Sequence, residues 1–410
     1  MCPKLNTYFI LVAFLIMNNV SQNRSGCCEC QACEQICSKK AIKMVANEEG
    51  FAYPHVDGSL CVNCGLCNKV CPMQHSEELK NEYKTVYAAK INETTVLTHS
   101  SSGGMFYLIS QFVFDKGGIV FGAAWDNNMK CRHTSARNNT ELKRLMGSKY
   151  VHSEIGNCYK EIKRLLMENI WVYFTGTPCQ VAGLKAYLGK NYPTLLTTDL
   201  VCHGTPSQKV FDVFLHAQER DLNQRVVDYN FRDKRIKGWS CSSSSSSSSI
   251  NKKGVKQLNI FNRNMQAYFK AFIKGHLSRM DCYNCPFASP MRPGDITIAD
   301  YWGIRKVHPE FPNPSEGTSM VIVSTDLGLQ VWNTVKSNAL YINSSMDLAL
   351  STGNANLYKS TILPNERLTS YSRIEKEFDV YRRELNRDSD SKLITYLKYF
   401  KRQILSHLKK

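Results

Sequence analysis

Eight cysteines near the amino end fall into two groups of four, each with the spacing Cys-x2-Cys-x2-Cys-x3-Cys. The groups are Cys27, Cys30, Cys33 and Cys37, then Cys61, Cys64, Cys67 and Cys71. Thiolates at this spacing hold two 4Fe-4S clusters, and the fourth cysteine of each group binds the other cluster. We therefore expect one cluster on Cys27, Cys30, Cys33 and Cys71. We expect a second cluster on Cys61, Cys64, Cys67 and Cys37.

Other thiol chemistry fits this pattern less well. Thiolates two residues apart also bind zinc, but zinc modules usually show two pairs of ligands rather than two groups of four. Disulfides suit short secreted chains, whereas this chain has 410 residues and 17 cysteines. The pattern favours clusters in a reducing compartment, and we expect a cytoplasmic protein. Cys28 is a surplus thiol beside Cys27, either spare or a substitute ligand, and Ser38 stands where proline often follows the fourth cysteine.

Four further cysteines occupy positions where a cluster could be held. Cys179 and Cys202 each follow a predicted strand, and Cys282 and Cys285 form a Cys-x2-Cys pair before Pro286. Residues just past the strand ends of a wound α/β sheet converge on one crevice, so these thiols could meet there. The alternative is that Cys179 and Cys202 are small buried apolar residues, which is common for free cysteine.

Three short segments could bind the phosphates of a flavin or nucleotide. Small residues that precede a helix permit close approach to its free N–H groups, although such residues also simply cap helices. A lysine could pair with phosphate and a tyrosine could stack on a ring system. The candidate cofactor residues are Ser101, Ser102, Gly103, Gly104, Ser148, Lys149, Tyr150, Thr175, Gly176 and Thr177.

His203, Lys149 and Asp300 are the candidate catalytic residues. His203 follows a predicted strand and has a side chain that titrates near neutral pH, so it is a candidate proton donor. A structural histidine bonded to a backbone carbonyl is the alternative. Asp300 could act as an acid or base, or could cap the turn at Tyr301, and Lys149 could be an ordinary exposed loop lysine.

Hydrophobic patterning predicts the elements that position these residues. A hairpin at 41–45 and 50–54 lies between the two cysteine groups. From residue 85 onward, strands alternate with helices, which predicts an α/β body with a partly parallel sheet. The predicted strands are 86–91, 119–125, 171–174, 195–201, 296–299 and 320–324. The predicted helices are 105–116, 157–168, 180–188, 208–219 and 327–337.

Three segments carry composition signals of their own. The apolar run Tyr8–Met17 is too short to span a bilayer and lacks a cleavage site, so we expect a leader without structural role, or a short buried element, in residues 1–25 rather than a secretion signal. The serine tract 242–249 predicts a surface loop or a frayed edge strand. The basic tail 371–410 ends in an amphipathic helix that we expect to dock on the core or to fray from it, with membrane-surface contact as the alternative. Its apolar stripe is Leu393, Leu397, Phe400, Ile404 and Leu408.

The chain is strongly basic, with a formal net charge of +17 from 52 Lys and Arg against 35 Asp and Glu. Such a field favours acidic partners, including an acidic electron carrier such as ferredoxin, an anionic substrate or a membrane surface. No nucleic-acid-binding motif is visible, so nucleic acid is not an expected partner.

Several motifs in order resemble the coenzyme F-420 hydrogenase/dehydrogenase beta-subunit family, in its bacterial form with a fused ferredoxin module. They are Ser102-Gly103-Gly104, Gly147-Ser148-Lys149-Tyr150, Gly176-Thr177-Pro178-Cys179-Gln180, Cys202-His203-Gly204, Cys282 to Cys285, Gly294-Asp295-Ile296 and Asp300-Tyr301-Trp302-Gly303. The resemblance implies FAD in the α/β part and a cluster on Cys179, Cys202, Cys282 and Cys285. It also implies a two-cluster ferredoxin domain at 26–75. Two further domains are implied, one at 84–160 of the N-terminal type and one at 168–340 of the C-terminal type found in the beta-subunit family.

We therefore expect an α+β protein, with a small ferredoxin-like two-cluster domain fused to a larger α/β flavin-binding domain. The expected function is an iron-sulfur flavoprotein oxidoreductase that passes electrons between a ferredoxin-type donor, 4Fe-4S clusters, FAD and a small-molecule substrate. One alternative is an electron-transfer subunit of a larger oxidoreductase without its own substrate. The other is a zinc-stabilised, non-redox binding module. The fold does not identify the substrate.

Overall fold

The computed structural model describes residues 19–20, 26–240, 245–387, 389 and 391–407. The predicted leader is therefore outside the described residues except for Asn19 and Val20, and so is Leu408 of the predicted apolar stripe. Among the described helices, none combines the length and the apolar character needed to cross a membrane.

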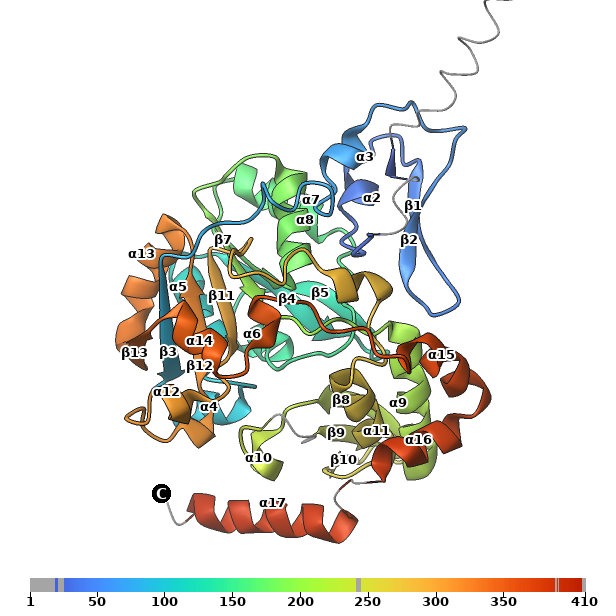
Figure 1. The fold of residues 1–410 in the computed structure, drawn as a ribbon, viewed down its shortest axis with the longest axis vertical. Helices are drawn as coiled ribbons and strands as arrows, with labels where there is room; N and C mark the ends of the chain where they lie inside the picture. The colour runs from blue at the N-terminus through green and yellow to red at the C-terminus, as the bar shows by residue number, and fades with distance from the viewer. Residues whose placement is uncertain (1–18, 21–25, 241–244, 388, 390, 408–410) are drawn as a thin grey trace, which may run out of the picture.

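The amino-terminal module is small and lies at one corner of the molecule (Figure 1). It contains α2 (Ala32–Ile36), β1 (Ile42–Ala46), β2 (Ala52–Val56) and α3 (Leu66–Lys69). β1 and β2 pair antiparallel, which confirms the predicted hairpin. Each of the two short helices follows a residue with a left-handed backbone, Gln31 or Gly65, so the chain turns sharply inside both cysteine groups.

The body is built on a mixed eight-stranded sheet with the order β13-β3-β12-β11-β7-β6-β4-β5. Four neighbouring strands, β11, β7, β6 and β4, run parallel, and the strands on either side of them pair antiparallel. The prediction of a partly parallel sheet is therefore confirmed. The strands are β3 (Thr85–Ile91), β4 (Ile119–Trp125), β5 (Cys131–Ala136), β6 (Val172–Gly176), β7 (Leu195–Leu200), β11 (Ile296–Asp300), β12 (Ser319–Val323) and β13 (Ala339–Ser344).

Helices cover both faces of this sheet, as the nearly continuous apolar strands require. One face buries Tyr173 and Leu196 against α5 (Met105–Asp115) and α13 (Asp326–Val335). The other face buries Phe121 and Phe174 against α7 (Cys158–Met167) and α8 (Pro178–Leu188). The remaining short helices of the body are α4 (Thr94–His99), α6 (Asn139–Leu145), α10 (Lys234–Lys237), α12 (Ile304–Val307) and α14 (Met346–Ser351).

A second, three-stranded sheet corrects the prediction for the serine tract. Its order is β10 (Lys256–Asn259), β9 (Ser246–Ile250) and β8 (Arg225–Asn230), so the serines form the central strand rather than a loop or an edge. Ser247 is 3% exposed and accepts a hydrogen bond from Gln218, and Ser249 is fully buried and accepts one from Asn259. The hydroxyls find partners inside the fold, so burial of a polar strand costs little here. The rest of the tract, up to residue 244, is outside the described residues.

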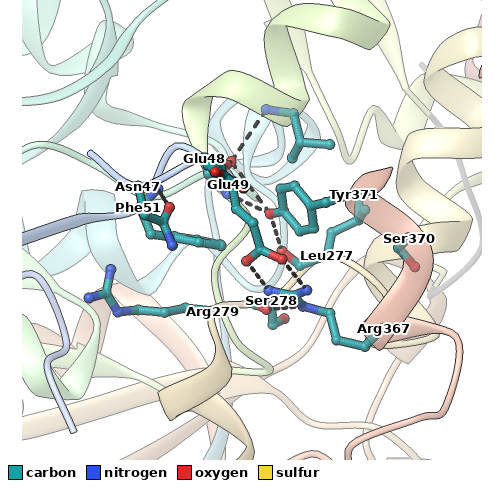
Figure 2. A network of polar contacts seen from close by, with 12 residues as sticks. Asn47, Glu48, Glu49, Phe51, Leu277, Ser278, Arg279, Arg367, Ser370 and Tyr371 are labelled. Atoms are coloured by element: carbon teal, nitrogen blue, oxygen red, sulfur yellow. Dashed lines mark hydrogen bonds and ion pairs between the residues drawn. The ribbon is translucent and has the colours of Figure 1, made fainter. Parts of the chain in front are cut away.

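The helices around the small sheet are α9 (Gln208–Leu222), α11 (Arg263–Ile273), α15 (Arg367–Lys376) and α16 (Phe378–Asn386). They enclose an aromatic core that includes Phe211, Phe214 and Tyr268. α15 also reaches the amino-terminal module, because the carboxylate of Glu49 forms two hydrogen bonds of 2.8 and 2.5 Å with the guanidinium of Arg367 (Figure 2).

The last helix, α17 (Lys392–His407), lies along the edge of the molecule next to α10 (Figure 1). The predicted stripe does not face the core: Leu393, Leu397, Phe400 and Ile404 are 69%, 60%, 56% and 61% exposed. Thr395, on another side of the helix, is buried instead. The expectation that the apolar stripe docks on the core is therefore wrong for the described part of the helix.

Candidate functional site

Cys27, Cys30, Cys33 and Cys71 meet in one hollow of about 380 Å³. We call this set the inner centre. Spacing alone assigned these four residues to one cluster, and the fold brings them together. Burial raises the pKa of Cys27 to about 11 and that of Cys33 further, and the neighbouring cysteines of the set act in the same direction. Thiols in such surroundings become thiolates when they bind a metal, so the donor set fits an iron-sulfur cube.

Cys37, Cys61, Cys64 and Cys67 form the other predicted set, which we call the outer centre. Cys67 is buried beside Ile42, and Cys37 packs against the same small core. Cys64 is exposed and Cys61 is half-buried. The outer centre is therefore more open to solvent than the inner one.

Among the described residues, no three His, Cys, Asp or Glu side chains lie close enough to share a single metal ion. The four thiolates of a 4Fe-4S cluster lie farther apart than the ligands of a single ion, because each thiolate binds a different iron atom.

Cys179, Cys202, Cys282 and Cys285 line one open cavity in the body. We call this set the body centre. Cys179 lies in the first turn of α8, and Cys202 follows β7. Cys282 lies within the short 3-10 helix Met280–Asn284, and Cys285 directly follows that helix. Burial raises the pKa of Cys282 to about 12 and that of Cys285 to about 11, and the surrounding cysteines contribute to both shifts. Four thiols around one cavity fit a further cluster.

A buried ion pair fixes the strand ends beneath the body centre. The guanidinium of Arg292 donates to Asp199 Oδ1 at 2.8 and 3.0 Å, and to the carbonyl oxygens of Phe287 and Leu200. Both ionic side chains are fully buried, so loss of either partner would leave an uncompensated charge. This pair joins the end of β7, which contains Asp199, to the segment that follows Cys282 and Cys285. It was not predicted, because nothing in the spacing of Arg292 and Asp199 marks them.

A second polar cluster gathers several predicted cofactor residues at the carboxyl edge of β3 and β11. The Ser101 hydroxyl accepts from the Ser148 N–H at 2.9 Å, and the Lys234 amine donates to the carbonyl oxygens of Ser102 and Leu97. Gly103 is required by packing, since a Cβ there would lie 2.3 Å from the Ala89 carbonyl oxygen. α5 then begins without a side-chain cap, so its first N–H groups are available to an anion.

Arg232 links Tyr150 and Asp300 in the same region. Its Nη1 donates to the Tyr150 hydroxyl at 3.1 Å and to Asp300 Oδ2 at 3.0 Å, while its buried Nη2 has no hydrogen-bond partner among the described residues. Trp239 donates to Asp300 Oδ1 and stacks on Trp302, with ring centroids 4.8 Å apart. The region thus offers buried cations and aromatic faces side by side.

Arg232, Lys234, Trp239 and Trp302 were missed as candidate site residues. The signal available was the basic run 232–237 directly before Trp239, which resembled an ordinary solvated charge cluster until the fold buried it. Burial lowers the pKa of Lys234 to about 7, so its charge depends on pH near neutrality.

Two of the predicted catalytic residues have structural partners. The Lys149 amine donates to the last carbonyl oxygens of α6, those of Arg144, Leu145 and Met146, at 2.7 to 3.1 Å. Desolvation lowers its pKa to about 8. The ring nitrogens of His203 lie 3.0 Å from the Ile273 carbonyl oxygen and 3.3 Å from Asn356 Oδ1, which matches the structural alternative considered for this histidine.

The remaining predicted residues stand nearer the body centre than the polar cluster. Thr177 and Gln180 form a capping box at the start of α8, and Cys179 lies in the same turn. The Thr175 hydroxyl donates to the Phe121 carbonyl oxygen, and Gly176 ends β6. Tyr150, by contrast, belongs to the polar cluster through Arg232 and also stacks on Phe272, with ring centroids 4.5 Å apart.

Two family descriptions match this chain. Residues 26–75 match the 4Fe-4S dicluster domain, and residues 170–347 match the C terminus of the beta subunit of coenzyme F420 hydrogenase/dehydrogenase. No curated protein matches significantly. A structure of the F420-reducing NiFe hydrogenase complex from Methanosarcina barkeri matches at 17% identity and a TM-score of 0.42, over 68% of this chain and 91% of that chain. At that score, the likeness supports no argument about either fold or function.

Proposed function

We propose that the chain belongs to the coenzyme F420 hydrogenase/dehydrogenase beta-subunit family, whose C-terminal description matches residues 170–347, and that it is an iron-sulfur flavoprotein oxidoreductase. In this proposal, electrons pass between an acidic ferredoxin-type carrier, three 4Fe-4S centres, FAD and a small-molecule substrate. The proposed domains are 26–75, 84–160 and 168–340. The observation that carries the proposal is that the cavity of the body centre adjoins the inner centre, with Cys28 and Met73 lining both.

The positions of the three cysteine sets support a path for electrons between the outer centre and the body centre by way of the inner centre. The outer centre is the more exposed, the inner centre lies against the body, and the body centre is inside it. Helix α2, which carries Cys33, packs on α7 and α8, and Cys179 lies in the first turn of α8. One rigid packing therefore holds the inner and body centres next to each other.

The polar cluster at the carboxyl edge is the proposed FAD site. The uncapped start of α5 and the unpartnered Nη2 of Arg232 suit phosphate oxygens, and the stacked Trp239 and Trp302 suit a flat ring. Bound there, FAD would supply the exchange between single electrons and a hydride. Ser101, Ser102, Gly104, Ser148 and Tyr150 would then hold the cofactor, as the sequence predicted.

The roles of Lys149, His203 and Asp300 in the chemistry stay proposals. Asp300 is the best placed of the three, because it belongs to the polar cluster and already pairs with Arg232. Lys149 precedes Tyr150 of that cluster, and His203 follows Cys202 of the body centre.

The surface around the outer centre suits an acidic carrier. Leu60, Val62 and Leu66 are 48%, 60% and 43% exposed beside Cys61 and Cys64. Exposed lysines lie nearby in the sequence, at Lys39, Lys40 and Lys69. An apolar patch rimmed by positive charge fits a negatively charged protein that docks briefly to pass an electron.

A second candidate is an electron-transfer subunit without its own substrate. The family description of a beta subunit favours it, and partner oxidoreductase subunits would then receive the electrons. Both candidates can be tested with the whole protein purified without oxygen. Oxidation of a reduced ferredoxin by the protein alone, with an added substrate, supports the enzyme, whereas turnover only with partner subunits supports the relay.

A further inference from the structure

Cys28 is a fifth thiol at the boundary between two four-thiol sets. The inner centre is complete with Cys27, Cys30, Cys33 and Cys71, and the body centre is complete with four cysteines of its own. Cys28 lines the hollows of both sets. Cys28 shares one hollow with Cys179 and the other with Cys30, and these two thiols have the largest influence on the pKa of the Cys28 thiol.

Packing prevents this contact from opening. Gly183 of α8 faces Cys30, and a Cβ at Gly183 would lie 2.9 Å from the Cys30 Cβ and 3.0 Å from its Sγ. The Tyr159 hydroxyl, which donates to the Gln180 carbonyl oxygen at 2.7 Å, closes the same place. The two ligand sulfurs therefore approach Cys28 from two elements that touch without a gap.

We propose that Cys28 is not a ligand but a thiol bridge between a ligand sulfur of the inner centre and a ligand sulfur of the body centre. This inference rests on the proposed body centre. A thiol has one proton to donate, so it can hydrogen-bond to one ligand sulfur at a time. It favours the centre whose sulfur accepts that proton. Hydrogen bonds to ligand sulfurs raise or lower cluster potentials, so the bridge sets the balance between the two centres. One electron leaves one centre and enters the other, while no bond breaks and the proton stays on Cys28.

The test compares Cys28→Ala and Cys28→Ser in the full chain, with Cys131→Ala as the matched control. Cys131 is also buried but lines neither hollow. Iron content and the redox potentials of the centres, from titrations followed by electron paramagnetic resonance, are measured in each variant. We expect full iron content in every variant. In Cys28→Ala we expect a shift of about tenfold in the equilibrium between the two centres, or about 59 mV for a one-electron couple. Cys28→Ser should restore most of the original equilibrium between the two centres.

Three results would overturn the bridge. Loss of iron in Cys28→Ala would make Cys28 a ligand, unchanged potentials would remove its influence, and an equal shift in Cys131→Ala would make the effect nonspecific. Failure of the proposed function looks different, because an unmutated protein without iron in the body centre lacks that centre's signal from the start.

The exposed face of α17 carries a second, independent inference. Its apolar residues point to solvent, and the segment 391–410 contains no acidic residue. Lys392 and Lys401 are exposed on the same helix. A helix with an apolar face flanked by lysines lies flat at the surface of an anionic membrane, with its apolar side chains among the acyl chains. We propose that α17 binds a lipid surface rich in anionic headgroups.

Vesicle sedimentation of the full chain tests this second inference. The vesicles contain phosphatidylcholine with or without phosphatidylglycerol, and the variant is Leu397→Glu with Phe400→Glu. Leu368→Glu is the control, since Leu368 is 68% exposed on α15. We expect binding to anionic vesicles only, and a loss of about tenfold or more in the α17 variant, because two apolar side chains no longer insert. Equal binding by the variant, or a dimer in solution that the variant dissolves, would overturn it.

Discussion

The two halves of the amino-terminal module follow the same cysteine spacing but stand in different surroundings. Cys30 and Cys33 of the inner centre are 7% and 9% exposed, and Cys30 belongs to the same apolar core as Tyr159 and Leu184 of the body. The outer centre has Cys64 exposed and apolar Val62 turned to solvent. The repeated spacing therefore builds two equivalent sets of cysteine ligands. The residues around each set determine whether it contacts the body or is open to solvent.

Ion pairs hold to the body the part of the amino-terminal module that carries the inner centre, which we call the inner half. Arg279, which is 1% exposed, donates to Glu29 and to the carbonyl oxygens of Cys27 and Ala52. Arg367 holds Glu49 in two hydrogen bonds and also donates to the Ser278 carbonyl oxygen (Figure 2). These contacts fix the inner centre on the body, whereas the outer centre keeps a free face for a transient partner.

Loss of a ligand should distinguish the two halves most strongly. Cys33→Ala and Cys64→Ala should each remove about four irons, because a cube lacking one ligand is not held firmly. Only Cys33→Ala should also lower the melting temperature of the whole chain, since the inner centre lies within the packed interface. Iron analysis and thermal unfolding measure the two effects. Equal loss of stability in both variants would contradict the difference between the halves.

The attachment of the inner half should depend on Arg367. Replacement by Met removes two hydrogen bonds to the partly exposed Glu49 carboxylate, and hydrogen bonds to charged groups contribute about 1.5–3 kcal/mol each. Arg373→Met on the same helix α15 is the control, since its pairs with Glu377 and Glu384 are exposed and should contribute about 0–1 kcal/mol. Denaturant unfolding of both variants gives the comparison. Similar losses in the two variants would show that Glu49 and Arg367 do not anchor the module.

The sequence predicted the contiguous parts of this molecule better than the dispersed ones. Local spacing was enough for the inner and outer sets, and strand patterns predicted six strands of the large sheet. The convergence of Cys179, Cys202 and the Cys282 pair needed the resemblance, because three separate segments meet only in the folded sheet. Ser247 was misjudged and Arg232 was not considered for one reason: polar residues look exposed until their buried partners, Gln218 and Asp300, are in place.

The outer face should control the encounter with the carrier. Lys69→Glu should slow electron transfer from an acidic ferredoxin several-fold at low salt and much less at high salt, because ions screen exposed charges. Leu66→Ser should slow it at every salt concentration, since it removes apolar contact. Stopped-flow measurements over a salt series separate the two. Unchanged electron-transfer rates in both variants would show that the carrier does not dock at the outer centre.

The smallest expected effect is a pH dependence of flavin binding through Lys234. Its pKa of about 7 lies below the usual lysine value, so the amine is charged below that pH and neutral above it. A pyrophosphate beside the cation should therefore bind FAD more tightly at pH 6 than at pH 8. Lys234→Arg, which keeps its charge throughout, should flatten the dependence in a flavin fluorescence titration. The same slope in both proteins would exclude Lys234 from the site.

The central claim is that thiol sets in the module and in the body hold consecutive iron-sulfur centres. Its most direct test is the iron and acid-labile sulfide content of the whole protein purified without oxygen. Three cubes predict about twelve irons and as many sulfides per chain, falling by about a third in Cys282→Ala. Stoichiometric zinc without iron or sulfide would contradict the account.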